Sequence, residues 1–316
     1  MSNIILISGI NGFVGSNLSL YLKGNRHLVS GLGREQSNQT IENPSEFTWD
    51  DLSLIKRKGF HAIIHLAGKA HDLKKTSDDE EYFKVNTDLT KSLFDLFLQS
   101  EIRDFIYFSS VKAVADKVDG ILKEDLTPSP YTPYGQSKLQ AESYLLSKLL
   151  PAGKRLFILR PCMIHGPGNK GNLNLLYKVV KRGIPYPLAG FQNQRSFLSI
   201  HNLNYIIEKI ISDQNITGGI YNVADDAALS TNDVIKIIAK ADGKEARLWK
   251  INTGIIKIIA SIGDKLRLPL NSERLKKLTE SYVVSNNKIK HALKIENLPI
   301  SSREGLLTTI KSFRSS

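Results

Sequence analysis

The sequence predicts an α/β protein with a doubly wound parallel sheet and a smaller lobe toward the C-terminus. Short apolar segments alternate with amphipathic segments up to about residue 165, which is the order of strands and helices in such a sheet. After His165-Gly166-Pro167-Gly168 the chain becomes rich in Gly, Pro and Asn between short amphipathic segments, which indicates the second lobe. With 316 residues, 41% of them hydrophobic, the chain is long enough to bury a sizeable core.

The expected elements follow one another along the first half of the chain. We expect strands where short runs are almost wholly apolar, because a parallel sheet is buried on both faces. These strands span residues 3–8, 27–32, 60–67, 105–109 and 155–160. The expected helices span residues 16–22, 82–98, 134–149 and 172–182.

A glycine-rich turn, Gly9-Ile10-Asn11-Gly12-Phe13-Val14-Gly15, separates the first strand from the first helix. In this order the backbone amides and the positive end of the helix dipole face a phosphate. Three glycines in seven residues also occur in ordinary turns, but the position between a strand and a helix favours a dinucleotide site. The candidate cofactor-binding residues here are Gly9, Gly12, Phe13, Val14 and Gly15.

The end of the second strand bears on which dinucleotide binds. A site for NAD usually presents an Asp or Glu to the ribose hydroxyls, whereas this chain has Gly33-Arg34. Arg34 could neutralise a 2′-phosphate, which slightly favours NADPH over NADH, or it could be a solvated turn residue. Asp50 is a candidate contact for the adenine by its position.

Tyr134 and Lys138 lie four residues apart in an expected helix, so the phenol and the ammonium share one face. An ammonium beside a phenol lowers the pKa of the tyrosine, which gives a general acid/base near neutral pH. Ser110, at the end of a strand, either hydrogen-bonds the substrate oxygen or caps a turn. Asn86 either supports the part of the site that contains Lys138 or occupies a solvent-exposed position on its helix. Together with a dinucleotide site, these residues predict hydride transfer at a carbonyl or alcohol carbon.

Composition and charge limit the kinds of binding partner and the cellular location that we expect. The net charge of +12 suits an anionic ligand, but Lys and Arg are scattered and no nucleic-acid motif is present, so we expect no nucleic-acid partner. The single cysteine, Cys162, excludes a disulfide framework and suits a reducing cytoplasm, and no histidine pair has metal-ligand spacing. The first apolar run is too short for a signal peptide, and residues 255–262 are too few to span a membrane.

Eight short motifs occur in the order typical of the extended short-chain dehydrogenase/reductases. They are the glycine turn, His65-Leu66-Ala67-Gly68, Val85-Asn86-Thr87, Ser109-Ser110, Tyr134-Gly135-x-Ser137-Lys138-x-x-Ala141-Glu142, Leu159-Arg160-Pro161, Gly166-Pro167-Gly168 and Arg195-Ser196-Phe197-Leu198-Ser199-Ile200. Over essentially its whole length the chain therefore resembles the nucleotide-sugar epimerase/dehydratase branch of this family.

The resemblance implies a role for each motif. A Rossmann domain would span residues 1–165, with a return segment near 198–225, and residues 166–316 would form a mainly substrate-binding lobe. Ser110, Tyr134 and Lys138 would be the catalytic triad, and Arg195 would bind the diphosphate of a UDP-sugar. The remaining cofactor contacts would be Leu66, Ala67, Gly68, Asn86 and Pro161. The remaining candidates at the substrate mouth are Lys69, His71, His165 and Asn172. The resemblance also implies a homodimer through a four-helix bundle, formed by the segments 94–98 and 141–149 of each copy.

Departures from the family pattern narrow the activity. Sugar-nucleotide 4,6-dehydratases carry an Asp-Glu pair after the catalytic hydroxyl, but this chain has Val111-Lys112, which excludes dehydration. Two activities stay open. A 4-reductase delivers hydride once to a 4-keto sugar, and a 4-epimerase keeps NAD bound and returns hydride to the other face. The segment 185–199 and Arg34 favour the reductase, acting on a UDP-4-keto-6-deoxy-N-acetylhexosamine for surface polysaccharide. A non-catalytic dinucleotide sensor or scaffold is the least favoured, because such proteins typically lose the Tyr or the Lys.

Overall fold

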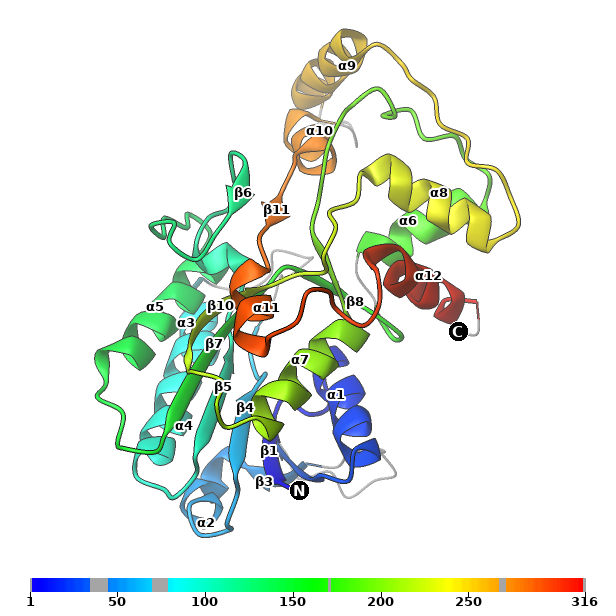
Figure 1. Cartoon of the computed structure of the whole chain (residues 1–316). Coiled ribbons are helices and arrows are strands. Elements are labelled where there is room, and N and C mark those ends of the chain that lie inside the picture. Colours follow the sequence, from blue (N-terminus) through cyan, green and yellow to red (C-terminus); the bar gives the residue numbers. More distant parts are fainter. Residues whose placement is uncertain (1, 35–44, 70–78, 170–171, 267–270, 315–316) are drawn as a thin grey trace.

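A computed structural model describes residues 2–34, 45–69, 79–169, 172–266 and 271–314. Its central feature is a seven-stranded sheet with the order β10-β7-β5-β4-β1-β2-β3, in which every neighbouring pair is parallel (Figure 1). The strands are β1 (Ile4–Ser8), β2 (Leu28–Gly33), β3 (Ser45–Thr48), β4 (Ala62–His65), β5 (Asp104–Phe108), β7 (Arg155–Pro161) and β10 (Gly219–Val223). The doubly wound parallel α/β fold is confirmed.

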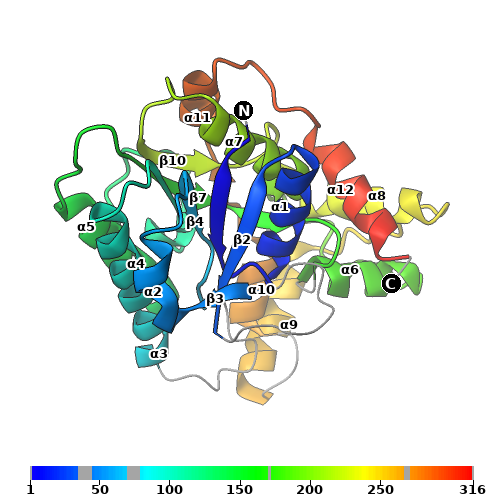
Figure 2. The ribbon, with the colours of Figure 1, turned by 90° about the horizontal axis from the view of Figure 1, so that it is seen from below.

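Helices cover both faces of the sheet because its strands are apolar on both sides. One face packs against α1 (Phe13–Gly24), α7 (Ile200–Ser212) and α11 (Asn287–Leu293). The other packs against α2 (Leu52–Ile55), α4 (Leu89–Leu98) and α5 (Pro133–Ser147). Figure 2 shows α1 and α7 on one side of the strands and α4 and α5 on the other.

A second group of helices lies beyond the carboxyl ends of the strands (Figure 1). There α6 (Asn172–Lys181), α8 (Thr231–Ala241) and α12 (Ser302–Ser312) share one apolar cluster. A separate cluster joins α9 (Thr253–Leu266) to α10 (Ser272–Thr279). Two small parallel pairs complete this part, β8 (Met163–His165) with β9 (Phe197–Ser199) and β6 (Ile121–Leu122) with β11 (Val283–Val284).

The helix expected over residues 82–98 differs most from the structure. It is divided into α3 (Asp79–Phe83), a π-helical turn (η2, Lys84–Asp88) and α4. The π turn holds the buried residues Asn86 and Thr87, and Thr87 donates a hydrogen bond to the Ser137 carbonyl of α5 (2.9 Å). Such turns are often found at functional sites, and this one orients two polar side chains toward α5.

Candidate active site

Tyr134 lies in the first turn of α5, opposite the end of β5. Thr132 caps this helix by accepting a hydrogen bond from the Gly135 amide (3.3 Å), and Pro133 occupies its first position. Ser110 follows β5 and begins a short 3₁₀ helix (η3, Val111–Ala113). The Ser110 side chain lies close enough to the Tyr134 phenol to lower its pKa. The fold therefore brings the predicted hydroxyl and the predicted phenol together.

Burial raises the pKa of Tyr134 above its ordinary value, and the nearby Ser110 side chain offsets only part of this effect. The prediction that Lys138 lowers this pKa is therefore wrong for the unliganded protein. The reason is the direction of the ammonium. Lys138 Nζ donates a hydrogen bond to the Phe108 carbonyl (2.8 Å) and lies over the ring of Tyr107, 5.0 Å from its centroid.

Lys138 is itself a buried charge. Its side chain is only 5% exposed, and burial lowers its pKa to about 8, although Glu142, one turn along the helix, acts in the opposite direction. A Cβ atom at Gly68 would lie 3.1 Å from Lys138 Nζ and 3.0 Å from Asn86 Oδ1. The backbone after β4 thus comes so close to Lys138 that a side chain at position 68 would crowd the ammonium.

Asn86 connects the loop after β4 to α5. Its Oδ1 accepts from the Lys69 amide (2.7 Å), and its Nδ2 donates to the Lys69 carbonyl (3.1 Å) and to Ser137 Oγ (2.9 Å). The side chain is fully buried, so it is not a solvated helix position. These three bonds hold the segment that carries Gly68 and Lys69 beside Lys138.

A buried ion pair beneath the site was not predicted. Arg160 on β7 donates from Nη2 to Glu142 Oε2 (2.5 Å) and from Nε to Oε1 (3.0 Å), and both side chains are almost fully buried. The Ser109 hydroxyl donates to the same carboxylate. Both charged residues belong to motifs quoted above, but spacing within one helix cannot show that Glu142 pairs with Arg160 on a strand.

The glycine turn has the geometry that a dinucleotide pyrophosphate requires. Gly9 has φ +73°, and a Cβ there would lie 2.9 Å from the Ala67 amide nitrogen. A Cβ at Gly15 would lie 2.4 Å from the Gly9 carbonyl oxygen. At Gly12, the N-terminus of α1 has no side-chain cap and no acidic residue in its first turn. The amides of Phe13, Val14 and Gly15 at this end of the helix therefore suit an anionic group.

The other predicted cofactor residues lie on several segments. The Leu66 amide donates to the Ser8 carbonyl and the Ala67 amide to the Ser8 hydroxyl, both at 3.1 Å, and Pro161 ends β7. Arg34 is exposed directly after β2. Asp50 is exposed in a 3₁₀ turn (η1, Trp49–Asp51) after β3. The first three residues lie at the carboxyl ends of strands, where ligands bind in doubly wound sheets.

Arg195 lies where the C-terminal lobe meets the end of β5. Its Nε donates to the Glu280 carbonyl at the end of α10 (3.0 Å), and burial lowers the pKa of the guanidinium. Lys112 lies nearby, with Nζ 4.4 Å from the ring centroid of Tyr282. Burial lowers the pKa of Lys112, the carboxylates of Asp116 and Glu280 act in the opposite direction, and the positive charge of Arg195 has a smaller lowering effect. Lys112 was noted in the sequence only as a departure from the dehydratases, so its place beside Arg195 was missed.

The other residues predicted to bind the substrate are Lys69, His71, His165 and Asn172. Lys69 is half-buried, forms an ion pair with Glu81 (2.5 Å) and lies 5.6 Å from the ring centroid of Tyr82, which itself makes an edge contact with Tyr134. The prediction that His165 contacts the sugar is wrong. Its side chain is fully buried, and its Nδ1 is bonded to the Thr309 hydroxyl (2.8 Å). His71 and the side chain of Asn172 lie outside the described residues.

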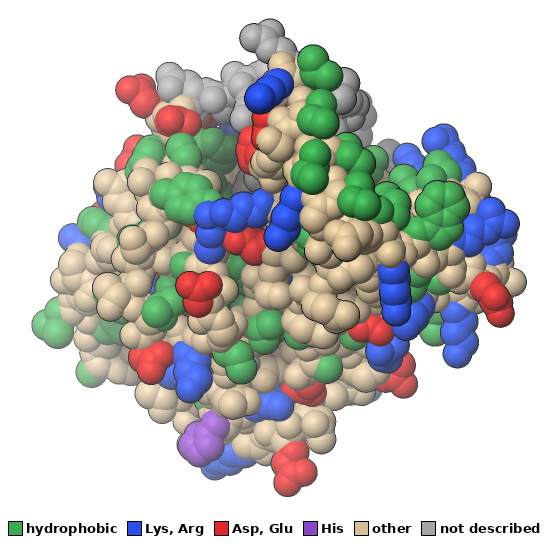
Figure 3. All heavy atoms as spheres, turned by 90° about the horizontal axis from the view of Figure 1, so that it is seen from above, with side chains coloured by type: hydrophobic (Ala, Val, Ile, Leu, Met, Phe, Trp, Pro, Cys, Tyr) green, Lys and Arg blue, Asp and Glu red, His purple; other side chains and the backbone are tan. Residues whose placement is uncertain are grey.

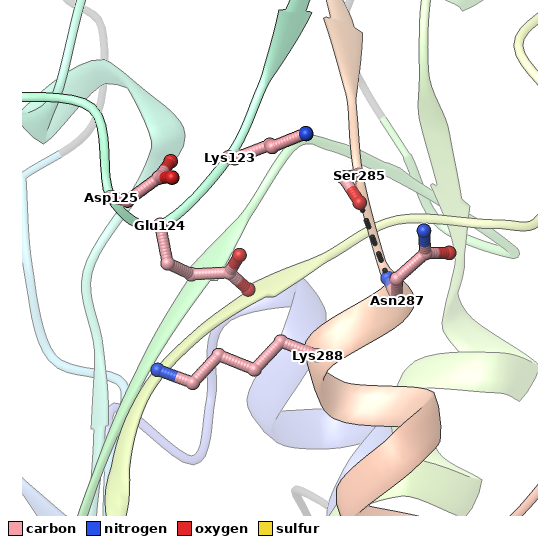
Figure 4. Close-up of a pocket in the computed structure, with 6 residues that line it drawn as sticks. All are labelled: Lys123, Glu124, Asp125, Ser285, Asn287 and Lys288. Carbon is pink, nitrogen blue, oxygen red and sulfur yellow. Dashed lines mark hydrogen bonds between the residues drawn. The ribbon is translucent and has the colours of Figure 1, made fainter.

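A cavity of about 460 Å³ opens elsewhere, between the segment after β6 and the start of α11 (Figure 4). Charged and polar side chains line it: Lys123, Glu124, Asp125, Ser285, Asn287 and Lys288. Glu124 accepts a hydrogen bond from the Asn222 amide of the edge strand β10 (2.8 Å), so this carboxylate has a structural contact. None of the predicted catalytic residues lines this cavity.

The segments predicted to form a dimer are largely buried within this chain. The buried apolar residues are Phe94, Leu96, Phe97, Ala141 and Leu145. Leu146 and Leu149 are exposed and remain available to a second copy. The homodimer thus stays a prediction with less apolar surface than the sequence indicated.

The described residues lack both a membrane-spanning helix and a metal-binding cluster. In this part of the chain no helix is both long and apolar enough to cross a membrane. The same residues contain no cluster of three or more His, Cys, Asp or Glu side chains that could hold a metal ion.

Known proteins share both the sequence and the fold. The profile of the NAD dependent epimerase/dehydratase family matches residues 5–224. The chain is 30% identical to a UDP-glucose 4-epimerase of Vibrio cholerae over 263 residues, which are 79% of each protein. It is 25% identical to a GDP-6-deoxy-D-mannose reductase of Pseudomonas aeruginosa over 252 residues, which are 76% of this chain and 80% of the relative. The structure of a Bacillus cereus UDP-N-acetylglucosamine 4-epimerase superimposes with a TM-score of 0.75 at 20% identity and covers 99% of both chains. The resemblance seen in the sequence is confirmed, and the chain belongs to the NAD-dependent epimerase/dehydratase family of nucleotide-sugar enzymes.

Proposed function

We propose that this enzyme reduces the C4 carbonyl of a UDP-4-keto-6-deoxy-N-acetylhexosamine, a step in the synthesis of surface polysaccharide. The observation that carries the proposal is the proximity of Ser110, at the end of β5, to Tyr134 on the helix that also carries the buried Lys138. Together with the glycine turn after β1, these residues form a site for hydride transfer at the carboxyl ends of the strands. Residues 1–165 and the return segment would hold the cofactor, and residues 166–316 would mainly hold the sugar nucleotide.

When bound, NAD(P)H supplies the hydride that forms the new C4–H bond. Tyr134 donates its phenolic proton to the C4 oxygen, so the carbonyl becomes an alcohol and the phenol becomes a phenolate. Ser110 donates a hydrogen bond to the same oxygen and orients it. Lys138, whose ammonium lies beside Gly68 and is bonded to the Phe108 carbonyl, would bind the cofactor.

The substrate diphosphate would lie between Lys112 and Arg195. These two cations lie close enough for one to lower the pKa of the other, so an anion between them would relieve their repulsion. Arg195 can bind a diphosphate bidentately, whereas Lys112 acts as a point charge. This arrangement explains why a lysine replaces the acidic residue that a dehydratase would need.

One observation favours reduction over epimerisation. Arg34 stands where an NAD site usually has an acid, and a 2′-phosphate would pair with it. A UDP-hexose 4-epimerase is the second candidate, because the relative from Vibrio cholerae carries that name at 30% identity.

One assay separates the two. The purified protein receives NADPH or NADH with UDP-4-keto-6-deoxy-N-acetylglucosamine, and the absorbance of reduced nicotinamide is followed. We expect stoichiometric oxidation that Tyr134→Phe abolishes and Tyr131→Phe, at an exposed position on the preceding turn, leaves unchanged. Retained NAD, no oxidation, and interconversion of a UDP-hexose with its C4 epimer would instead establish the epimerase.

A further inference from the structure

The helix α9 exposes a continuous apolar stripe. Its exposed residues are Ile255, Ile258, Ile259, Ile262 and Leu266, each between 44% and 65% exposed. They recur at the spacing of one helical face. A different face, which contains Ile256 and Ala260, already packs against Leu188 and Leu275. The stripe is therefore additional to the core of this lobe, and soluble proteins rarely leave such contiguous patches uncovered.

Positive charge is concentrated in the chain segment that contains this stripe. Residues 244–277 contain nine Lys and Arg and three Asp and Glu, so half of the chain's net charge of +12 lies in these 34 residues. Lys257 and Lys265 are exposed on α9 itself, and Trp249 is exposed in the preceding segment. Figure 3 looks down on the end of the molecule that carries α9 and shows a line of hydrophobic side chains with Lys and Arg side chains next to it.

We infer that α9 and the basic residues around it bind the surface of a membrane that contains anionic lipid. A helix of 14 residues is about 21 Å long, too short to span a bilayer but suited to lie in its interface. Its isoleucines enter the boundary between headgroups and acyl chains, while Lys265, at the edge of the stripe, extends its ammonium group to lipid phosphates. Lys257 lies on the far side of the helix and adds attraction to the anionic surface at longer range. Trp249 is of the residue type that prefers this depth.

A second copy of the chain fits this surface less well. A twofold interface places the same patch on both subunits, so the basic segment of one copy would face the identical segment of the other. Such like-charge contact opposes association, whereas an anionic bilayer is complementary to it. Because Arg195 is bonded to the end of α10, and α10 packs on α9, membrane binding would bring the lobe that carries Arg195 to the lipid surface.

Vesicle co-sedimentation of the full chain tests this inference. We expect binding to vesicles in which about a third of the lipid is phosphatidylglycerol, loss of binding at high salt, and little binding to phosphatidylcholine alone. Ile258→Gln/Ile262→Gln should weaken binding by about tenfold. The control Leu20→Gln/Leu54→Gln removes two equally exposed leucines from α1 and α2 and should bind as the unmodified protein does.

A second pair of variants tests the charges. Lys257→Gln/Lys265→Gln should weaken binding by about 30-fold. Lys56→Gln/Lys58→Gln changes the net charge equally, away from α9, and should have little effect. The inference is overturned if the protein ignores the anionic vesicles, or if both α9 variants bind as well as their controls. It is also overturned if sedimentation shows a dimer that Ile258→Gln/Ile262→Gln dissociates while vesicle binding is absent.

Discussion

Replacing Lys138 by Met should change how the stability of the unliganded protein depends on pH. Burial lowers the pKa of Lys138 from 10.5 to about 8, so the folded state holds the proton less tightly than the unfolded state. Because folding lowers this pKa, the buried Lys138 destabilises the folded state by its full amount below about pH 8. It fades as the pH rises toward 10.5, where the unfolded chain also loses the proton. A shift of this size corresponds to about 3 kcal/mol.

Urea denaturation at a series of pH values measures this effect. Between about pH 7 and pH 10.5, the free energy of unfolding of the unmodified protein should rise by about 3 kcal/mol relative to that of Lys138→Met. Titration of other groups is common to both proteins and cancels in the difference. The exposed helix residue Lys236 provides the control, since Lys236→Met should give a profile parallel to the unmodified protein. Parallel profiles for Lys138→Met as well would refute the claim that Lys138 is a strained buried charge.

Three further substitutions test the cofactor site and its support. Gly15→Ala places a Cβ against the Gly9 carbonyl, so it should destabilise the fold by about 1–3 kcal/mol in urea denaturation and weaken cofactor binding. The control Gly24→Ala, which has open space around it, should stabilise the fold by about 0.5–1 kcal/mol in the same assay. Arg160→Met leaves Glu142 buried without its partner and should cost about 3–5 kcal/mol, most of which Arg160→Met/Glu142→Leu should restore. Arg34→Ser should weaken NADPH about tenfold and leave NADH unchanged in fluorescence titrations, and equal effects on both would exclude a contact with the 2′-phosphate.

The sequence was most informative where local pattern and burial agree. The apolar runs at β1, β5 and β7 identify strands because both faces of the sheet are covered. The edge strand β3 was missed, since its four residues carry little apolar signal. The place of β10 beside β7 was not specified, because only the folded chain determines which strands are neighbours.

In the candidate site, too, contacts within one element could be predicted and contacts between distant parts of the chain could not. Spacing within one helix placed Tyr134 beside Lys138, and the end of β5 supplied Ser110. Spacing could not show that the Lys138 ammonium is bonded to the Phe108 carbonyl, 30 residues earlier in the chain. For the same reason it misplaced His165, whose partner Thr309 is 144 residues away.

Burial acts on Tyr134 and Lys138 in opposite directions and favours the uncharged form of each, phenol and amine. A phenol can donate a proton to a carbonyl oxygen, but removing a proton from an alcohol requires phenolate. Phenolate becomes accessible near neutral pH only when positive charge is added close to Tyr134. An oxidised nicotinamide ring carries that charge and a reduced one does not. The residues around Tyr134 are therefore compatible with either direction of hydride transfer, and the choice between reductase and epimerase depends on which redox form of the cofactor the site retains. The contacts of the triad alone therefore do not decide the activity.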